Sequence, residues 1–330
     1  MNDTDGWAQQ SSFRLNQKQI WINFVVQERS FVATKENLIM RVFVTGATGF
    51  IGTAIVQELL GAGHQVLGLA RSDASAQKLI EAGAEVHRGD LEDLDSLRSG
   101  AAQADGVIHA GFIHDFTRFA AVCEVDKVAI KTIGEVLAGA DRPLIVTSGT
   151  ALVSPGKLAT EHMKPPVNPG WPRASEQTGD SVGAASVRLS PSVHGDEDQH
   201  GFVPILVNIA KEKGFSAYIG EGLNRWNAVH RLDAAHLFRL ALENATPGAR
   251  YHASAEEAIT VRSIAEAIGK QLNLPVRSVT PEAAAAHFGW FAQMAAIDCP
   301  ASSAWTQETL NWHPTHSTLL ADIENGIYTK

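Results

Sequence analysis

A strand that passes into three evenly spaced glycines and then into a helix is the feature that most constrains the fold of this 330-residue chain. Residues 41–45 form a short apolar run with β-branched side chains, typical of a buried strand. Gly46, Gly49 and Gly52 follow, and an amphipathic helix is predicted from Ile51 to Leu60. The first glycine of such a turn allows a tight bend, the second lets backbone approach a pyrophosphate, and the third lets helix and strand pack closely. Because N–H groups at the helix start are left free for phosphates, the sequence predicts a dinucleotide site.

The first half of the chain alternates predicted strands and helices. Further strands are predicted at residues 65–70, 85–89, 106–109, 143–147 and 186–189, and helices at residues 73–82 and in a long segment that ends near Ala138. Alternation at this spacing implies right-handed crossovers and a parallel sheet covered by helices on both faces. The sequence therefore predicts an α/β fold with a doubly wound parallel sheet.

Composition and charge exclude several classes of function. Hydrophobic residues at 45% and charged residues at 19% are ordinary for a globular protein. The net charge of −9 gives no electrostatic reason to expect nucleic acid or an anionic membrane as a partner. No apolar run approaches the roughly 18 residues needed to span a bilayer, and Cys123 and Cys299 are too few for a disulfide framework. We expect a cytoplasmic protein with a small-molecule substrate, and a homodimer is compatible with these features.

The glycine run Thr45-Gly46-Ala47-Thr48-Gly49-Phe50-Ile51-Gly52 resembles the extended and atypical short-chain dehydrogenase/reductase (SDR) superfamily, in the branch labelled NAD-dependent epimerase/dehydratase. The resemblance covers most of the chain from Met40 onward. It implies a Rossmann domain over residues 40–189 and a smaller C-terminal α/β substrate lobe over residues 190–330, with some segments returning to the main sheet. It also implies that Thr48, Phe50 and Ile51 contact the cofactor beside the three glycines.

Residues 1–39 lie outside this pattern. They lack the basic start, apolar middle and small-residue cleavage site of a signal peptide. We expect an accessory or disordered extension. A real extra strand or a partner-binding arm is the alternative, since Trp21, Phe24 and Phe31 could bury something.

The predicted cofactor is NADP(H). NAD-specific folds carry a carboxylate roughly 20 residues past the glycine turn, where this chain has Arg71 and Ser72. A guanidinium can pair with a 2′-phosphate that a carboxylate would repel, and the Ser72 hydroxyl would assist. The alternative is that Arg71 is an ordinary solvated arginine at a strand end.

Two later turns match the family's cofactor pocket. After the third predicted strand, Asp90 would accept a hydrogen bond from the adenine amino group and Leu91 would pack against the ring. After the fourth, the turn His109-Ala110-Gly111 would line the ribose and pyrophosphate. The remaining predicted contacts are Thr147, Pro191 and Val193.

The family's reaction centre uses a tyrosine, a lysine four residues later and an upstream serine or threonine, and this chain departs from it. Its only tyrosines, Tyr218, Tyr251 and Tyr328, follow the sixth predicted strand. Residues 167–176, which should carry the Tyr-x-x-x-Lys pair, contain prolines and a glycine that predict a loop. Arg173 lies near the lysine's place, but guanidinium is a poor proton donor.

Other polar residues are candidates for the missing chemistry. Ser148 is the first choice and Thr150 the second for polarising a substrate carbonyl, and His114, His194 or water could supply the proton. Asp126 could support a water path or make a core hydrogen bond. Asp233 is expected to cap the helix that follows it. No metal site is predicted, because the histidines and aspartates of residues 194–200 match no ligand spacing.

Three functions remain open from the sequence. The first is an NADPH-dependent oxidoreductase acting on a small carbonyl, hydroxyl or sugar-like substrate, which the second lobe favours. The second is a non-catalytic NADP-binding regulator or sensor, which the missing tyrosine favours. The third, an NAD(P)-dependent epimerase or dehydratase, is weakened because that chemistry needs an efficient base.

Overall fold

The computed structural model describes residues 39–151, 153–166 and 172–329. Contacts divide the chain between Ile39 and Met40, and the unit of residues 40–330 is described below. The expectations for the N-terminal extension, and for most of the predicted loop that begins at residue 167, fall outside the described residues.

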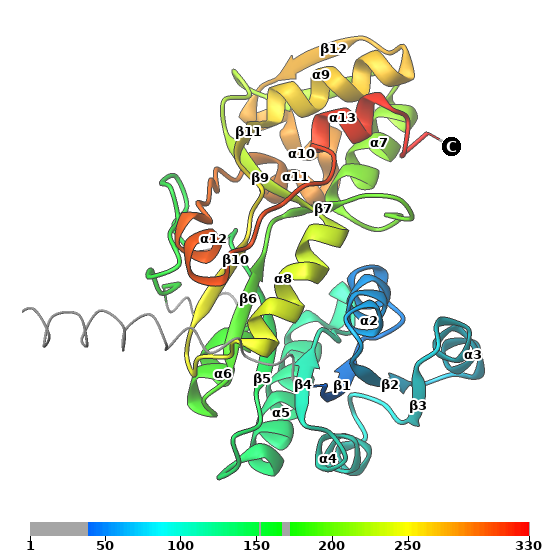
Figure 1. Ribbon diagram of the computed structural model, residues 1–330. Helices are drawn as coiled ribbons and strands as arrows, with labels where there is room; N and C mark the ends of the chain where they lie inside the picture. The colour runs from blue at the N-terminus through cyan, green and yellow to red at the C-terminus, as the bar shows by residue number, and fades with distance from the viewer. Residues whose placement is uncertain (1–38, 152, 167–171, 330) are drawn as a thin grey trace, which may run out of the picture. The chain divides into compact units, whose positions relative to one another are not determined.

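Seven parallel strands form the centre of this unit, in the order β10-β6-β5-β4-β1-β2-β3 (Figure 1). They are β1 (Arg41–Thr45), β2 (Gln65–Ala70), β3 (Glu85–Arg88), β4 (Gly106–His109), β5 (Leu144–Gly149), β6 (Ala185–Leu189) and β10 (Arg250–Ala253). The predicted doubly wound α/β fold is confirmed.

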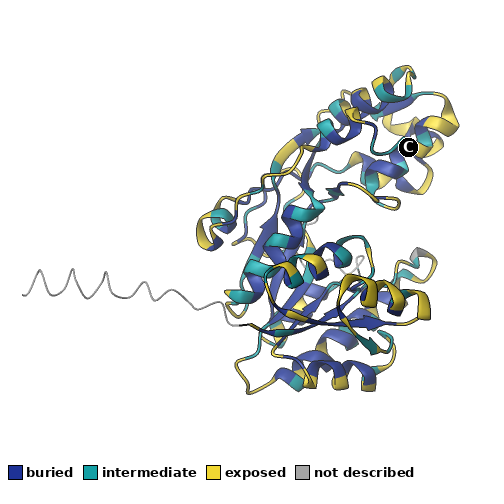
Figure 2. Cartoon of the chain, turned by 45° about the vertical axis from the view of Figure 1, so that its right-hand side comes forward, coloured by how far each residue is buried: buried dark blue, intermediate teal, exposed yellow. Residues whose placement is uncertain are grey.

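Alternate side chains of the strands build two separate cores. Val42 and Val44 of β1 pack with α2 (Phe50–Gly61), α3 (Asp73–Ala82) and α8 (Arg231–Glu243). Phe43 points the other way, toward α4 (Leu94–Ala102) and α5 (Phe119–Leu137). Inner strands such as β1 and β4 are buried on both faces, which is why they are almost uniformly apolar, whereas the edge strand β3 is partly exposed and polar. Figure 2 shows the buried strands between helices whose outer sides are exposed.

A second group of elements, here called the C-terminal lobe, has its own core around Trp226 and Phe291. Its sheets are β11-β9-β7 and β12-β8. The strands are β7 (Ser192–His194), β8 (Ser216–Ile219), β9 (Arg225–His230), β11 (Glu256–Thr260) and β12 (Val276–Val279). The helices are α7 (Phe202–Lys213), α9 (Val261–Leu272), α10 (Ala284–Phe288), α11 (Ala292–Ala296) and α13 (Leu319–Glu324).

Two segments from the second half of the chain return to the central sheet and its covering helices. Helix α8 packs beside α2, and β10 pairs in parallel with β6 in the register Val187 to Tyr251. Two helices lie outside the lobe's core, α6 (Ser175–Ser181) against α5 and α12 (Ala304–Leu310) against β10. In the described ranges no helix is both long and apolar enough to cross a bilayer.

Candidate cofactor and active site

The glycine turn lies at the switch point of the central sheet, where β1 and β4 are neighbours and their onward connections run to opposite sides. Open α/β sheets bind ligands in the crevice outside such strand ends. Gly46 has a φ of +67°, and a Cβ there would lie 2.7 Å from both the Ala110 oxygen and the Gly111 nitrogen. A Cβ at Gly52 would lie 1.9 Å from the Gly46 oxygen. Side chains at these positions would destroy the turn, so backbone alone can form it.

The start of α2 beside this turn is suited to an anion. Its N-cap, Gly49, offers no side-chain hydrogen bond to the first turn of the helix, which also holds no acidic residue. The first N–H groups of α2 are therefore left for a ligand, and the helix dipole favours a negative charge there. Backbone-only walls and an uncapped helix fit the pyrophosphate of NAD(P), and Thr48, Phe50 and Ile51 remain predicted contacts.

The His109 side chain lies beneath this turn rather than in it. The imidazole is buried, with Nδ1 2.9 Å from the Thr45 hydroxyl and Nε2 3.2 Å from Asp126. The same hydroxyl accepts the Gly111 N–H at 3.2 Å. These bonds fix the backbone of Ala110 and Gly111, which is the part of the predicted turn that faces the cradle. Sequence reasoning missed Thr45, because its role depends on a partner that lies 64 residues away.

At the predicted adenosine end, the structure brings Arg71 and Asp90 together. The Arg71 side chain is 76% exposed, and its Nε lies 3.7 Å from the Asp90 carboxylate. The Ser72 hydroxyl accepts the Ser75 N–H and caps α3, so its assistance to Arg71 competes with this cap. Leu91 does reach the cradle, since its Cδ2 would lie 3.2 Å from a Cβ at Gly111. A second cation, Arg88, lies on the adjacent strand and pairs with Asp73.

The hydroxyl groups at the end of β5 and directly after it differ in their surroundings. Ser148 is half-buried at the end of the strand, and no described residue hydrogen-bonds its hydroxyl. Thr147 donates to the His109 carbonyl at 2.9 Å. Thr150, the second choice for polarising a carbonyl, is 1% exposed and donates to the Leu189 oxygen or the Asn227 side chain. That prediction is corrected, because the Thr150 hydroxyl is committed to the core.

Arg173 and His114 share one corner of the site. The Arg173 guanidinium lies 4.3 Å from the centre of the Phe112 ring, and the Phe112 and His114 rings are 5.5 Å apart. Loss of water around His114 and the positive charge of Arg173 both lower the pKa of this histidine. The predicted proton donor therefore lies beside a cation.

Asp126 joins this corner to the cofactor turn. Its carboxylate accepts hydrogen bonds from His109 and, at 2.6 Å, from the Ser175 hydroxyl. Burial alone would raise the pKa of Asp126, but the His109 and Ser175 contacts outweigh it and lower that pKa. Of the two roles considered for Asp126, the structure shows the core hydrogen bond.

His194, the other predicted proton donor, is a core residue. It is 1% exposed, and its Nδ1 lies 2.6 Å from the Asp322 carboxylate of α13. Its Nε2 is buried, makes no hydrogen bond with a described residue, and lies 3.9 Å from the Glu256 carboxylate. Its neighbours in sequence, Pro191 and Val193, are half-buried and remain predicted cofactor contacts. The role of His194 as a substrate acid is corrected, because the imidazole is sealed inside the C-terminal lobe.

Asp233 does not cap α8. The cap is His230, whose Nδ1 accepts the Leu232 N–H at 3.2 Å. The Asp233 carboxylate instead accepts the backbone N–H groups of Thr315 and His316, and so ties the C-terminal segment to α8. The capping expectation is therefore wrong, and its cause is a contact across 82 residues.

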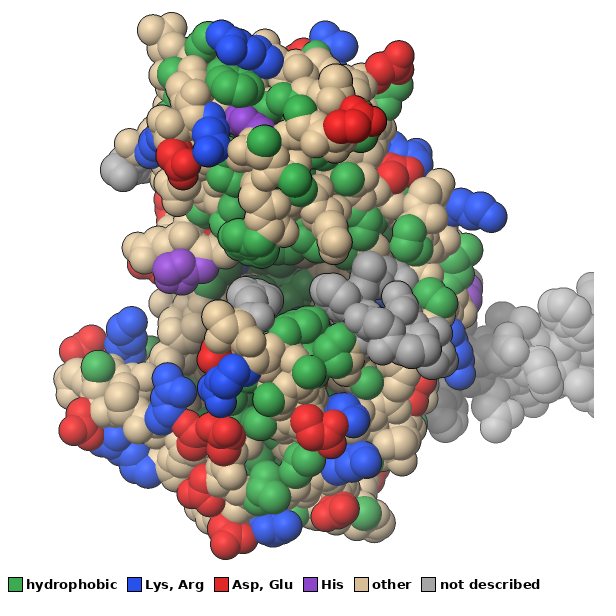
Figure 3. Space-filling model, turned by 180° about the vertical axis from the view of Figure 1, so that it is seen from behind, with side chains coloured by type: hydrophobic (Ala, Val, Ile, Leu, Met, Phe, Trp, Pro, Cys, Tyr) green, Lys and Arg blue, Asp and Glu red, His purple; other side chains and the backbone are tan. Residues whose placement is uncertain are grey.

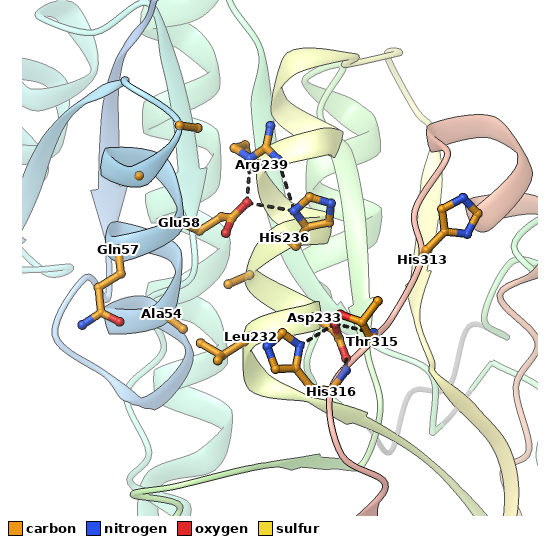
Figure 4. A pocket seen from close by; sticks show the side chains of 13 residues that line it. Ala54, Gln57, Glu58, Leu232, Asp233, His236, Arg239, His313, Thr315 and His316 are labelled. Atoms are coloured by element: carbon orange, nitrogen blue, oxygen red, sulfur yellow. Dashed lines mark hydrogen bonds and ion pairs between the residues drawn. The ribbon is translucent and has the colours of Figure 1, made fainter.

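A groove of about 640 Å³ lies between α2, α8 and the segment around His316 (Figure 4). None of the predicted catalytic or cofactor residues lines it. Its polar side chains bond to one another, with Glu58 accepting from Arg239 at 2.7 Å and from His236 at 2.8 Å. A different recess, with hydrophobic side chains inside it, separates the central-sheet half from the C-terminal lobe in Figure 3.

Comparison with known proteins agrees with this architecture. Residues 42–171 match the model of the NAD dependent epimerase/dehydratase family. The uncharacterized protein C2A9.02 of Schizosaccharomyces pombe is 52% identical over 295 residues, or 88% of this chain and 100% of that protein. A 4-hydroxy-2-methyl-3-oxo-4-farnesyl-3,4-dihydroquinoline-1-oxide ketoreductase of Stigmatella aurantiaca is 26% identical over 68% of this chain and 71% of that protein.

A solved structure shares the fold. The dTDP-glucose 4,6-dehydratase DesIV of Streptomyces venezuelae, with NAD bound, has a TM-score of 0.68 and 18% identity, over 87% of this chain and 96% of that chain. Three observations lead to one conclusion: the glycine turn at the switch point, the family match over residues 42–171, and the relative that is matched over its full length. The chain belongs to the NAD-dependent epimerase/dehydratase family of extended SDR proteins, whose members bind NAD(P).

Proposed function

We propose that this protein is an NADPH-dependent reductase of small carbonyl compounds. The observation that carries the proposal is the backbone-only cradle at the switch point with the half-buried Ser148 hydroxyl two strands away on β5. The ketoreductase of Stigmatella aurantiaca, a relative along two thirds of the chain, supports a carbonyl substrate.

The protein's own groups have distinct tasks in this proposal. NADPH, when bound, supplies the hydride that the carbonyl carbon receives. The Ser148 hydroxyl donates a hydrogen bond to the carbonyl oxygen and so stabilises the negative charge that develops there. His114, or a water beside it, delivers the proton to that oxygen. The buried Thr45–His109–Asp126–Ser175 network keeps the turn and the Arg173 corner in register.

The preference for NADPH rests on Arg71, which stands where NAD-specific relatives of this fold carry an acid. Its 3.7 Å contact with Asp90 is loose, and the side chain is exposed, so a 2′-phosphate can compete for it. We expect tighter binding of NADPH than of NADH in a fluorescence titration, and loss or reversal of this preference in Arg71→Glu. Arg98→Glu, on the exposed side of α4, is the matched control. Equal affinities in the unmodified protein would overturn the NADPH assignment.

Mutations at the reaction centre test the reductase itself. Ser148→Ala should lower the rate of carbonyl reduction by about 10²–10³, the usual cost of one oxyanion hydrogen bond. Tyr218→Phe, Tyr251→Phe and Tyr328→Phe, made singly, should retain activity. A tyrosine variant that binds NADPH but has no turnover would show that the reaction centre lies elsewhere.

A non-catalytic NADP-binding sensor is the second candidate. The position of the tyrosines favours it, since Tyr251 is buried in β10 and the hydroxyl of Tyr328 is buried beside Asp198. The same observation weighs against an epimerase or dehydratase, which needs an efficient base. Binding of NADPH without oxidation by any member of a carbonyl panel would favour the sensor.

A further inference from the structure

Arg173 differs from the other buried or half-buried arginines in the described ranges. With one exception these pair with carboxylates, namely Arg41, Arg188, Arg225, Arg231, Arg239 and Arg250. The exception, Arg142, donates to three backbone carbonyls. Arg173 is half-buried, yet no carboxylate of the described residues lies within ion-pair distance of it, and it makes one hydrogen bond.

The surroundings of Arg173 fix the guanidinium while leaving its outer edge unused. Nε donates to the Ser175 hydroxyl at 3.2 Å, and that hydroxyl donates onward to Asp126. The face of the guanidinium lies 4.3 Å from the Phe112 ring centre. The two terminal nitrogens have no hydrogen-bond partner in the described part of the chain. They are also not among the polar side-chain atoms that are fully buried without a hydrogen bond. A planar fork of donors is therefore held in one orientation and open to a ligand.

The Arg173 guanidinium lies at the end of the sheet where the substrate carbonyl would react. Ser175 and Asp126 link Arg173 to His109, the last residue of β4. Ser148 lies on the adjacent strand β5, two residues beyond the partner of His109. The fork thus lies on the same edge of the sheet as the hydroxyl assigned to the carbonyl oxygen.

We infer that Arg173 binds a carboxylate of the substrate, so that the protein reduces oxo acids rather than neutral ketones or sugars. This inference rests on the proposed reductase function and names its substrate class. One guanidinium with two free nitrogens matches one carboxylate in a bidentate pair. A phosphate dianion is a poorer match, because Arg118, four residues beyond His114, is already paired with Asp115.

The same pairing has a consequence for the proton donor. The positive charge of Arg173 is one of the causes that lower the pKa of His114. A carboxylate bound to Arg173 offsets this charge and raises the pKa of His114 toward neutral, where imidazolium is available as an acid. A neutral ketone would leave that pKa low.

The experiment measures binding without turnover, by calorimetry on the complex of the full chain with oxidised NADP, which cannot reduce the probe. The probes are straight-chain oxohexanoates with the oxo group at carbon 2, 3, 4 or 5, with 2-hexanone as the neutral control. At least one oxo acid should bind about tenfold to a hundredfold more tightly than 2-hexanone, as expected for charge-assisted hydrogen bonds. Arg173→Gln should abolish this difference, and Arg173→Lys should restore only part of it, because ammonium lacks the fork.

Controls separate this inference from the proposed function. Arg98→Gln should bind the oxo acids like the unmodified chain, and binding of NADP to Arg173→Gln shows that this variant is folded. Equal binding of 2-hexanone and the oxo acids, or unchanged binding in Arg173→Gln, would overturn the inference, as would preferential binding of dihydroxyacetone phosphate. Oxo acids that bind through Arg173 but are not reduced by NADPH would uphold the carboxylate site and remove the reductase.

Discussion

Two glycines at opposite ends of α2 have different structural requirements. A Cβ on Gly52 would lie 1.9 Å from the Gly46 oxygen, whereas a Cβ on Gly61 would meet nothing within 4 Å. Both residues belong to the same helix, and both have ordinary negative φ angles. Only Gly52 is needed for the close approach of helix and turn.

Gly52→Ala should therefore displace α2 from the turn. We expect a loss of about 1–3 kcal/mol in the free energy of unfolding, as in other overpacked sites, and NADPH binding weakened by about tenfold or more. Gly61→Ala is the control on the same helix and should be neutral or stabilise by up to about 1 kcal/mol. Urea unfolding and fluorescence titration measure the two effects. Similar results for both variants would contradict this account of the cradle.

The positions of single residues in the candidate site were predictable where they depend on nearby sequence. The glycines, Arg71 and Ser148 lie at strand ends, and strand ends can be located from apolar runs. Thr150 and His194 have equally suggestive neighbours, but they bond to Asn227 and Asp322, which are 77 and 128 residues away. Burial of a side chain depends on such distant partners, and no local pattern reports them.

At the scale of elements, ion pairs hold helix α6 against strands β6 and β10. The Glu176 carboxylate of α6 accepts hydrogen bonds from Nε and Nη2 of Arg188, at 2.7 and 2.6 Å. It accepts another from Nε of Arg250 in β10, at 2.8 Å. Arg188 also donates to His252, and burial together with this guanidinium lowers the pKa of His252 to about 4. The network fixes the short helix that carries Ser175 and, through it, Arg173.

Glu176→Gln should break this network and leave buried guanidinium charge without its carboxylate. The expected loss is about 3–5 kcal/mol in the free energy of unfolding. Glu135→Gln, on the exposed side of α5, should change it little. Denaturant unfolding of the three proteins at neutral pH gives the comparison. A loss no larger than that of Glu135→Gln would show that packing alone holds α6.

The same variant has a defined pH dependence. Burial would raise the pKa of Glu176, but the bonds from Arg188 and Arg250 outweigh it and lower that pKa in the folded state. The stabilisation is therefore complete above the unfolded pKa of about 4.3 and is lost as pH falls through the lower folded value. The difference between the unmodified chain and Glu176→Gln should shrink as the pH falls below about 4.3. A difference that grows toward acid pH would contradict the assigned sign.

Elements with strong apolar periodicity were predicted well, and short polar ones were not. The strands of the central sheet agree with the predicted ranges to within about two residues. Helices α4 and α6 were missed, because each is short, and α6 carries buried polar residues such as Glu176 instead of an apolar stripe. The membership of β10 in the main sheet depends on long-range pairing with β6, which no local pattern reports.

At the scale of the whole unit of residues 40–330, the order of the chain differs from the order of the layers. The chain leaves the central sheet after β6, forms part of the C-terminal lobe, and returns for α8 and β10 before entering the lobe again. A fragment of residues 40–189 would lack the neighbour of β6 and the helix that packs beside α2. We expect this fragment to unfold without a cooperative transition, whereas residues 40–330 should melt as one unit. Circular dichroism of both on heating is the measurement, and a sharp transition in the fragment would refute the expectation.

The two returns of the chain to its sheet also limit how such a protein can be recombined. A new substrate lobe cannot be exchanged with a relative as one continuous cassette, because any cut that removes the lobe also removes α8 and β10. Exchange with a relative must instead replace separate stretches on either side of α8 and β10, such as the residues from β7 to β9 and those after β10. Diversification of substrate range by swapping is therefore expected to proceed piecewise, with the sheet as the common frame.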